Sequence, residues 1–200
     1  MESVLAELYF DKKGTGYVAT SNINTNQLVL KEHTVITICK KSKSYKDIIF
    51  KMIHLLTLNK KTLLKFNNLC PHKTDPLCIP ECKMKKMIGE INSNGVRFYL
   101  SNIPITNAIL YYEKIRRNIF ECGDKMFLMF DGSKFNHSCD PNVDYYFDEK
   151  ENILSFYANK DINKGIELTI SYIKPNIDKT CLKTTYGFDC DCKICIGSIK

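Results

Sequence analysis

The stretch FNHSCDPN, residues 135–142, carries one cysteine, and the stretch DCDCKIC, residues 189–195, carries three more in the pattern Cys-x-Cys-x-x-Cys. In this pattern a tight turn can present three sulfurs to one tetrahedral ion. A closed structural site needs a fourth ligand, and Cys139 is the candidate because Pro141 stiffens the chain beside it. We therefore predict one structural zinc ion that ties the tail to the body of the protein. Its ligands would be Cys139, Cys190, Cys192 and Cys195.

Two alternatives to the zinc site remain open. The cysteines could be buried free thiols, or Asn136-His137-Ser138 could be an N-glycosylation acceptor, whose short pattern it fits. Ten cysteines would suggest disulfides in a secreted protein. The opening MESVLAELYF, however, has an acidic residue where a secretory signal has its basic cluster. We expect an intracellular protein in a reducing compartment, where clustered cysteines more often hold metal.

Composition indicates a globular protein that is not in a membrane. Of the 200 residues 44% are hydrophobic and 26% charged, and no stretch approaches the roughly 18 apolar residues of a membrane helix. The net charge of +7 comes from 26 lysines and only three arginines. A basic face could contact DNA, a nucleosome or an acidic protein. Alternatively, the lysines form a solvated surface and reflect an AT-rich genome, such as that of an intracellular parasite or a large DNA virus.

The residue patterns predict strands, then a helical insert, then strands again. Apolar residues at helical spacing predict helices over about 45–59 and 105–118. Between them, CPHKTDPLCIPEC at 70–82 has three prolines and is predicted to be irregular. A last helical turn or two is expected over about 177–187. Strands are predicted at GTGYVAT, QLVLKEHTVITIC, KMFLMF, VDYYFD, ILSFYANKD and IELTISYI.

Four stretches resemble the SET-domain protein lysine methyltransferases, most closely their SMYD branch. They are KGTGYVATSNINTNQLVLKE, FNHSCDPN, GIELTISY and YGFDCDCKIC, and the likeness covers about residues 8–38 and 118–197. The resemblance implies a mostly β, α+β fold of small sheets with a knot-like C-terminal threading. It further implies a SET domain over 1–177, interrupted by an insert of about 45–117, and a zinc-bound post-SET segment over 178–200.

The resemblance also assigns roles to individual residues. Tyr172 would be catalytic, and Phe120 and Tyr186 would line a channel for the substrate lysine. The S-adenosylmethionine cofactor would be bound by Lys13, Gly14, Gly16, Tyr17, Asn118, Ser133, Asn136, His137, Tyr172 and Phe188.

Chemical arguments support these roles, and some of these residues also have a plainer structural interpretation. Methyl transfer from a sulfonium to an amine depends on alignment and electrostatic fit, which the Tyr172 hydroxyl can help to hold. A narrow apolar channel disfavours the ammonium form of the substrate lysine and lowers its pKa. In the plainer interpretations, Tyr172 is an ordinary strand end and Phe188 only packs over the tail. Within NHSC, His137 is expected to be a structural and cofactor contact, not a general base.

The sequence also departs from the SMYD pattern. It lacks a recognisable MYND module and the C-terminal helical domain. Ile166 also stands where the family usually has the first of two adjacent carboxylates, the second being Glu167. The substrate wall would then come from residues 45–117 or from a second subunit in an oligomer. Four residues between the predicted helices could hold a second ion, although free loop cysteines are the preferred interpretation. They are Cys70, His72, Cys78 and Cys82.

The sequence is compatible with three alternative functions. The first is a protein-lysine N-methyltransferase that acts on a histone tail as a chromatin regulator, in the nucleus or cytoplasm and in a host cell if the source is viral or parasitic. The second is a catalytically silent SET-type module that binds chromatin or a protein. In the third, residues 45–117 form the main functional surface.

Overall fold

The computed structural model describes residues 3–11, 13–41, 44–71, 79–91, 94–173 and 180–197. The chain divides into two compact units, residues 1–33 with 131–200 and residues 34–130. Each unit mixes helices with strands, so the α+β class is as predicted. Among the described helices, none combines the length and apolar character needed to cross a membrane.

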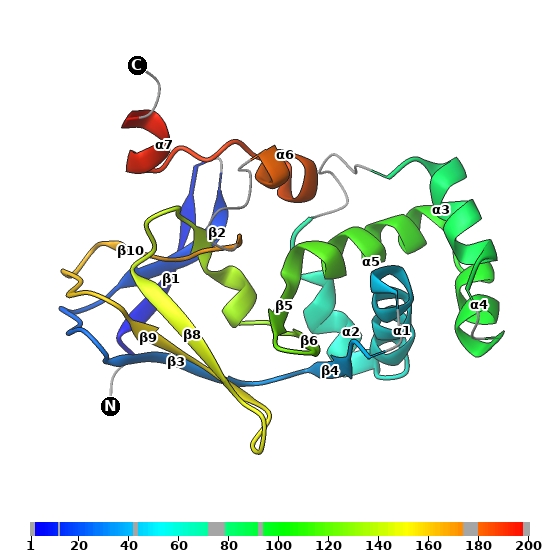
Figure 1. The fold of residues 1–200 in the computed structure, drawn as a ribbon, viewed down its shortest axis with the longest axis horizontal. Coiled ribbons are helices and arrows are strands. Elements are labelled where there is room, and N and C mark those ends of the chain that lie inside the picture. The colour runs from blue at the N-terminus through cyan, green and yellow to red at the C-terminus, as the bar shows by residue number, and fades with distance from the viewer. Residues whose placement is uncertain are drawn as a thin grey trace. The chain divides into compact units, whose positions relative to one another are not determined.

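The described strands of the first unit form two sheets (Figure 1). One has the strand order β1-β2-β10-β7, in which β10 is antiparallel to β2 and parallel to β7. Its strands are β1 Leu5–Phe10, β2 Gly14–Ala19, β10 Glu167–Ile170 and β7 Asn136–His137. The other has the order β3-β9-β8 and consists of β3 Leu28–His33, β9 Ile153–Ala158 and β8 Val143–Asp148.

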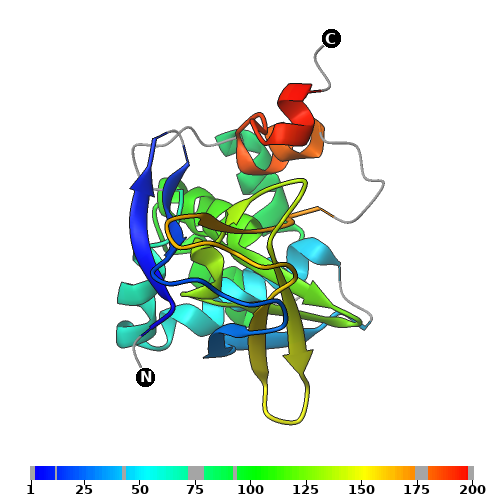
Figure 2. The same cartoon turned by 90° about the vertical axis from the view of Figure 1, so that its left-hand side faces the viewer.

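Local sequence explains the tight turns of the first unit. Gly14 has φ +78°, a left-handed conformation that favours glycine, directly after the turn from β1 to β2. Strands β8 and β9 form the long hairpin visible in Figure 2. In its turn the Asp148 carboxylate accepts the N–H groups of Lys150 and Glu151. The described residues of this unit also form three short helices: η1 Gly132–Lys134, α6 Thr180–Tyr186 and α7 Lys193–Gly197.

In the part of the second unit that the structure describes, five helices combine with a three-stranded antiparallel sheet. The sheet has the order β4-β6-β5, with β4 Ile36–Cys39, β6 Lys125–Leu128 and β5 Ile119–Cys122. The helices are α1 Tyr45–Thr57, α2 Lys60–Asn67, α3 Glu81–Gly89, α4 Asn94–Ser101 and α5 Ile105–Asn118. Two of the helices, α1 and α5, agree with the predicted ranges, whereas α2 and α4 were not predicted and α3 begins inside the segment predicted to be irregular.

Helix α1 shows why this unit folds as it does. The Ser44 side chain caps its first turn by accepting the Asp47 N–H at 3.2 Å. Apolar side chains at positions such as Ile49, Met52 and Ile53 then recur on one face and are fully buried. The unit is wider than the predicted insert because β4, β5 and β6 cluster with the helices. The predicted boundary at residue 177 lies outside the described residues.

Candidate active site

The parallel pair β7–β10 places Asn136 beside Thr169 and His137 beside Ile170, so the NHSC motif lies next to the strand that leads to Tyr172. The backbone N–H of Tyr172 donates to Nδ1 of the buried His137 at 3.1 Å. An accepting Nδ1 requires a neutral imidazole with its proton on Nε2. Nε2 lies 3.4 Å from the Cys139 sulfur, so this N–H is directed at a thiol of the predicted metal site.

The Tyr172 hydroxyl is fixed as well. It donates to the backbone carbonyl of Phe135 at 2.6 Å. Phe135 is fully buried, and its ring stacks on Phe156 with the centroids 4.7 Å apart. Tyr172 is therefore held at its backbone by His137 and at its phenol by Phe135, two residues apart in the same short segment.

Aromatic rings surround Tyr172. The ring of Tyr186 lies 4.8 Å from it, and the ring of Phe188 lies 6.4 Å from it and 6.1 Å from His137. The rings of Tyr172, Tyr186 and Phe188 are half-buried, so apolar ring faces remain accessible to a ligand. The structure thus brings together four of the predicted residues at one place.

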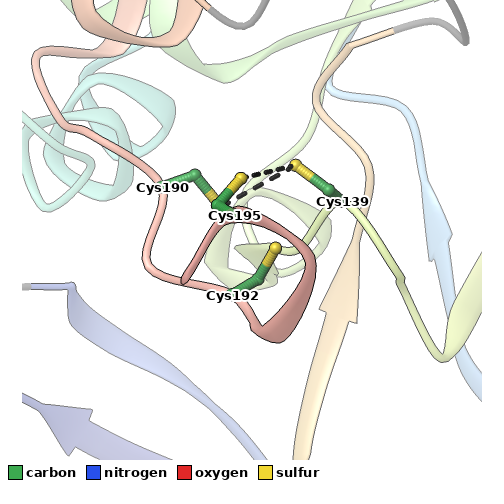
Figure 3. A group of neighbouring side chains, drawn as sticks. All are labelled: Cys139, Cys190, Cys192 and Cys195. Atoms are coloured by element: carbon green, nitrogen blue, oxygen red, sulfur yellow. Dashed lines mark hydrogen bonds between the residues drawn. The ribbon is translucent and has the colours of Figure 1, made fainter. Parts of the chain in front are cut away.

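The four predicted metal ligands converge (Figure 3). Their sulfur atoms all lie within 4.8 Å of one another, and Cys139 is 3.8 Å from Cys190 and 3.6 Å from Cys195. A tetrahedral zinc ion with Zn–S bonds of about 2.3 Å requires sulfur–sulfur distances of about 3.8 Å. All four cysteines are free thiols. The donor set and its spacing therefore fit one zinc ion.

The thiols of this cluster have divergent acidities. Burial opposes ionisation of Cys192, but hydrogen bonds from the backbone N–H groups of Cys195 and Cys139 lower the pKa of its thiol to about 6. Burial and the neighbouring thiols raise the pKa of Cys139. The lowered pKa of Cys192 favours its thiolate, the form that binds metal.

Lys13, Asn136 and Glu167 form a polar network on the same sheet. The Glu167 carboxylate accepts the Lys13 ammonium at 2.9 Å and the Asn136 amide at 2.9 Å. Burial disfavours the Lys13 charge, but the hydrogen bond and charge of Glu167 outweigh it and raise the pKa of Lys13. A Cβ on Gly16 would meet the Asn136 amide nitrogen at 2.3 Å, so glycine is required there by close packing.

Tyr17 and Ser133 also belong to the first unit. Tyr17 is 2% exposed, and its hydroxyl donates to the Asp131 carbonyl at 3.2 Å. Its side chain is thus committed to the core, and the predicted cofactor contact would have to use its backbone. Ser133 is half-buried within η1, and Gly14 is half-buried at the start of β2.

Asn118 and Phe120 belong to the second unit, at the junction of α5 and β5. Asn118 is 7% exposed, and its amide donates to the carbonyls of Cys70 at 2.6 Å and Lys114 at 2.7 Å. Phe120 is 8% exposed and stacks on Phe127 with the centroids 6.3 Å apart. Their assignments to the cofactor and the channel stay predictions.

The preference for loop cysteines over a second metal ion stays a prediction too. His72 and Cys78 lie outside the described residues, and Cys70 and Cys82 are exposed.

A pocket of about 500 Å³ opens in the first unit beside the cysteine cluster, within the usual size range of ligand pockets. Of the predicted site residues it includes Lys13, His137 and Cys192. Glu167, Thr169 and other polar residues form much of the remaining wall.

Comparisons with known proteins agree with this geometry. The sequence model of the family described as SET domain matches residues 14–173. The chain belongs to the SET-domain family. A SET domain-containing protein, L678 of Acanthamoeba polyphaga mimivirus, is 31% identical over 205 residues, which span 98% of this chain and 79% of that protein.

Shorter matches reach other proteins with SET domains. Histone-lysine N-methyltransferase SET5 of Vanderwaltozyma polyspora is 38% identical over 106 residues, or 49% of this chain and 21% of that protein. A SET and MYND domain-containing protein of Dictyostelium discoideum is 37% identical over 71 residues, or 34% of this chain and 20% of that protein. Both alignments thus cover only about a fifth of the relative.

Solved structures confirm the predicted SET fold. The SET domain of LSMT bound to methyl-lysine and AdoHcy superposes with a TM-score of 0.69 at 15% identity, covering 94% of this chain and 52% of that one. Rubisco LSMT bound to AdoMet gives a TM-score of 0.68 at 15% identity with the same coverage. The chain spans about half the length of these solved relatives, and at this identity the likeness shows the fold alone.

Sequence reasoning missed two residues that organise the site of this SET domain. Glu167 was assigned no role, yet it holds both Lys13 and Asn136. The Asn142 side chain accepts the Thr169 N–H at 2.8 Å and donates to the Glu167 carbonyl at 2.8 Å, which fixes β10. The asparagine of the DPN triplet was the available signal, because asparagine often bonds to nearby backbone.

Proposed function

We propose that this SET domain is an S-adenosylmethionine-dependent methyltransferase that acts on protein lysine side chains, with a histone tail as the favoured substrate. The observation that carries the proposal is Tyr172, whose phenol is held by the Phe135 carbonyl and whose backbone is held by His137. Transfer of a methyl group to an amine needs alignment more than a covalent intermediate, and a fixed phenol among aromatic rings suits that need. The reaction class also agrees with the names of the fungal relatives.

S-adenosylmethionine, when bound, supplies a methyl group on a sulfonium. Residues of the first unit suit its parts. Lys13, kept cationic by its raised pKa, suits the carboxylate end, and the half-buried Phe188 offers a ring face for the adenine. Backbone atoms around Gly14 and Asn136 would supply the remaining hydrogen bonds.

Tyr172 would orient the substrate amine. Its hydroxyl hydrogen is used in the bond to the Phe135 carbonyl, and a phenolic oxygen can accept a hydrogen bond at the same time. An amine N–H donated to this oxygen would turn the nitrogen lone pair in a defined direction. The lysine must be neutral to react, and the apolar rings of Tyr172 and Tyr186 disfavour its ammonium form.

We also propose that the cysteine cluster holds one structural zinc ion. The support is the fourfold thiol donor set, its sulfur spacing and the lowered pKa of Cys192. The ion would connect the segment that carries Tyr186 and Phe188 to the NHSC motif, and so keep the aromatic rings at Tyr172.

The test is methyl transfer from isotopically labelled donor to a histone mixture and to cell-extract proteins. Tyr172→Phe is expected to lower kcat about 10²-fold or more, because it removes one group placed at the reacting atoms. Its affinity for the donor should stay within about twofold, since the ring is kept. Tyr146→Phe, at an exposed tyrosine of β8, is the matched control and should leave transfer unchanged.

Mass spectrometry of the labelled histones would identify the modified lysine and the number of methyl groups. If the wild-type protein binds the donor but labels no protein, the enzyme proposal is wrong. The catalytically silent SET-type binding module would then be preferred.

We further propose that residues 34–130 contact polyanionic surfaces such as nucleosomal DNA. This unit has 17 lysines and arginines against 7 aspartates and glutamates, a net charge of +10. Five carboxylates of the unit are ion-paired within it, namely Glu81, Glu90, Glu113, Glu121 and Asp124. In the described part of the chain, no ion-pair partner is found for six exposed lysines on α1 to α3: Lys51, Lys60, Lys61, Lys65, Lys83 and Lys86. Such unmatched cations suit the regular phosphate array of duplex DNA.

A further inference from the structure

Glu32, at the end of β3, holds the backbone at the start of η1. Its carboxylate accepts the N–H of Asp131 at 3.0 and 3.1 Å and the N–H of Gly132 at 2.7 Å. N–H groups at the start of a helical turn have no carbonyl partner within the turn, and a carboxylate is a strong acceptor for them. Glu32 is half-buried, so this contact is partly shielded from water.

The same short segment is held at a second point. The Tyr17 hydroxyl donates to the Asp131 carbonyl at 3.2 Å, and the Tyr17 ring lies edge-on to Phe135 with the centroids 4.9 Å apart. Burial raises the pKa of Tyr17, so its hydroxyl keeps the proton that it donates. Glu32 therefore binds the N–H groups at the start of the segment 131–135, while Tyr17 binds a carbonyl at that start and packs against the ring at its end.

The far end of the segment carries the acceptor for Tyr172. The Phe135 carbonyl receives the Tyr172 hydroxyl at 2.6 Å, and the Phe135 ring is fixed by its stack on Phe156. A displacement of residues 131–132 would be passed along only three further residues to this carbonyl. The charged groups near this start are the Asp131 carboxylate and the Lys134 ammonium, which pair with each other at 3.0 Å. Lys134 also pairs with Glu7, so its ammonium is held by two carboxylates other than that of Glu32.

We propose that Glu32 is a positioning residue for methyl transfer, which acts through the Phe135 carbonyl on the Tyr172 hydroxyl. Glu32 does not touch the reacting atoms and sets only the place of the carbonyl that orients the phenol. This inference rests on the proposed methyltransferase function. Misplacement of a reacting group by about 1 Å can lower a rate about 10²-fold.

The test compares kcat and KM for a histone substrate in Glu32→Ala, Glu32→Gln and the control Asp144→Ala. Asp144 is an exposed carboxylate on β8 of the same sheet, and no hydrogen bond is found for it among the described residues. Glu32→Ala should lower kcat about 10²-fold with little change in KM or in donor affinity. Glu32→Gln keeps one carbonyl acceptor and should recover about tenfold of that loss. The kcat and KM of Asp144→Ala should match those of the wild type.

A double-mutant cycle separates positioning from general loss of structure. If Glu32 acts through the Tyr172 hydroxyl, Glu32→Ala should have little further effect in a Tyr172→Phe background. Independent, multiplying effects of the two substitutions would contradict the proposal. So would a folded Glu32→Ala protein with unchanged kcat.

A spectroscopic readout distinguishes this inference from the proposed function. In protein labelled with 3-fluorotyrosine, the fluorine resonance of Tyr172 is the one lost in Tyr172→Phe. Glu32→Ala and, to a smaller extent, Glu32→Gln should shift this resonance, while Asp144→Ala should not. A shift in a protein that transfers no methyl groups would support the positioning contact and contradict the enzyme proposal. An unshifted resonance would contradict the positioning contact itself.

Discussion

The two units of this SET domain differ in charge and in how they are stabilised. Residues 1–33 and 131–200 together carry 12 basic and 15 acidic residues, a net charge of −3, whereas residues 34–130 carry +10. The main apolar cluster, from Ile38 to Leu128, lies entirely within the second unit. The first unit adds to its own buried side chains a cluster of four thiols.

Under the proposed methyltransferase and polyanion-binding functions, this difference would place the groups that do chemistry and most of the basic surface in different parts of the chain. Tyr172, His137 and the cysteine cluster belong to the weakly acidic unit, where fixed hydrogen bonds set geometry. The six exposed lysines of α1 to α3 for which no ion-pair partner is found in the described part of the chain belong to the basic, apolar-cored unit. Changes around Tyr172 and the cysteine cluster should therefore alter catalysis or metal binding, and changes in the apolar cluster or at these lysines should alter packing or association.

The largest expected effect is on the first unit and follows metal removal. Structural zinc contributes on the order of 10 kcal/mol to the folding of small zinc peptides. Cys139→Ser, or a strong chelator, should release one zinc ion per chain and raise hydrogen exchange in α7 and around Tyr186. Exchange within α1 and α5 should stay low. Metal analysis and hydrogen-exchange mass spectrometry measure both effects.

Cys82→Ser is the control for metal removal, since Cys82 is an exposed thiol on α3. It should keep the ion. A wild-type protein purified with no bound metal would contradict the zinc proposal, and equal exchange in both units after chelation would remove the contrast between them.

A core truncation probes the second unit. Phe50 on α1 is fully buried, with its ring 5.3 Å from Tyr112. Phe50→Ala should lower the free energy of unfolding by about 3–5 kcal/mol, because it removes buried apolar surface and leaves a cavity. Urea unfolding monitored by circular dichroism measures the change. Phe98→Ala, at a phenylalanine that is 74% exposed on α4, should change it by no more than about 0.5 kcal/mol.

A smaller effect is expected at Lys114, a buried cation in the same unit. Its ammonium donates to the carbonyls of Asn67 and Leu69, where α2 ends. Lys114→Met should lower the free energy of unfolding by about 1.5–3 kcal/mol, because those carbonyls lose a charged donor. Urea unfolding is again the measurement, with the exposed Lys65→Met as the control. A neutral outcome at Lys114 would show that apolar packing alone fixes the end of α2.

The smallest expected effect is on association with DNA. Substitution of Lys60, Lys61 and Lys65 by glutamate should weaken binding of a fluorescent DNA duplex about tenfold near 0.1 M salt and flatten the salt dependence of the affinity. The control variant carries three lysine-to-glutamate substitutions at exposed lysines of the first unit, and its affinity should change much less. These lysines are Lys31, Lys150 and Lys164. Equal losses in both variants would contradict the assignment of the contact to residues 34–130.

Part of the fold could be predicted because its signals are local. Helix α1 follows an apolar repeat with a serine cap, and it lies where the sequence indicated. Helices α2 and α3 were missed because only Phe66 is buried on the first, and only Met84 and Ile88 on the second, which leaves too sparse an apolar pattern. The run 27–39 was taken as one β-rich stretch, yet β3 and β4 join different sheets. Strand partners depend on distant residues that a local pattern does not encode.

The candidate site likewise has one part that local sequence predicts and another that it does not. Cysteine spacing predicted the thiol cluster, because a tetrahedral ion restricts which spacings work. The Phe135 carbonyl could not be predicted, because a backbone acceptor has no residue signature. The carboxylates of Glu32 and Glu167 act on partners about 100 and 31 residues away in sequence, as the hydrogen bonds to Gly132 and Asn136 show.

The divided course of the first unit has a consequence for synthesis on the ribosome. Strands β1 and β2 are made early, but β2 pairs with β10, whose residues are translated about 150 positions later. The contiguous residues 34–130 can fold as they leave the exit tunnel, while the opening strands wait with an unpaired edge. Nascent chains stalled before residue 167 should therefore depend on chaperones that shield that edge.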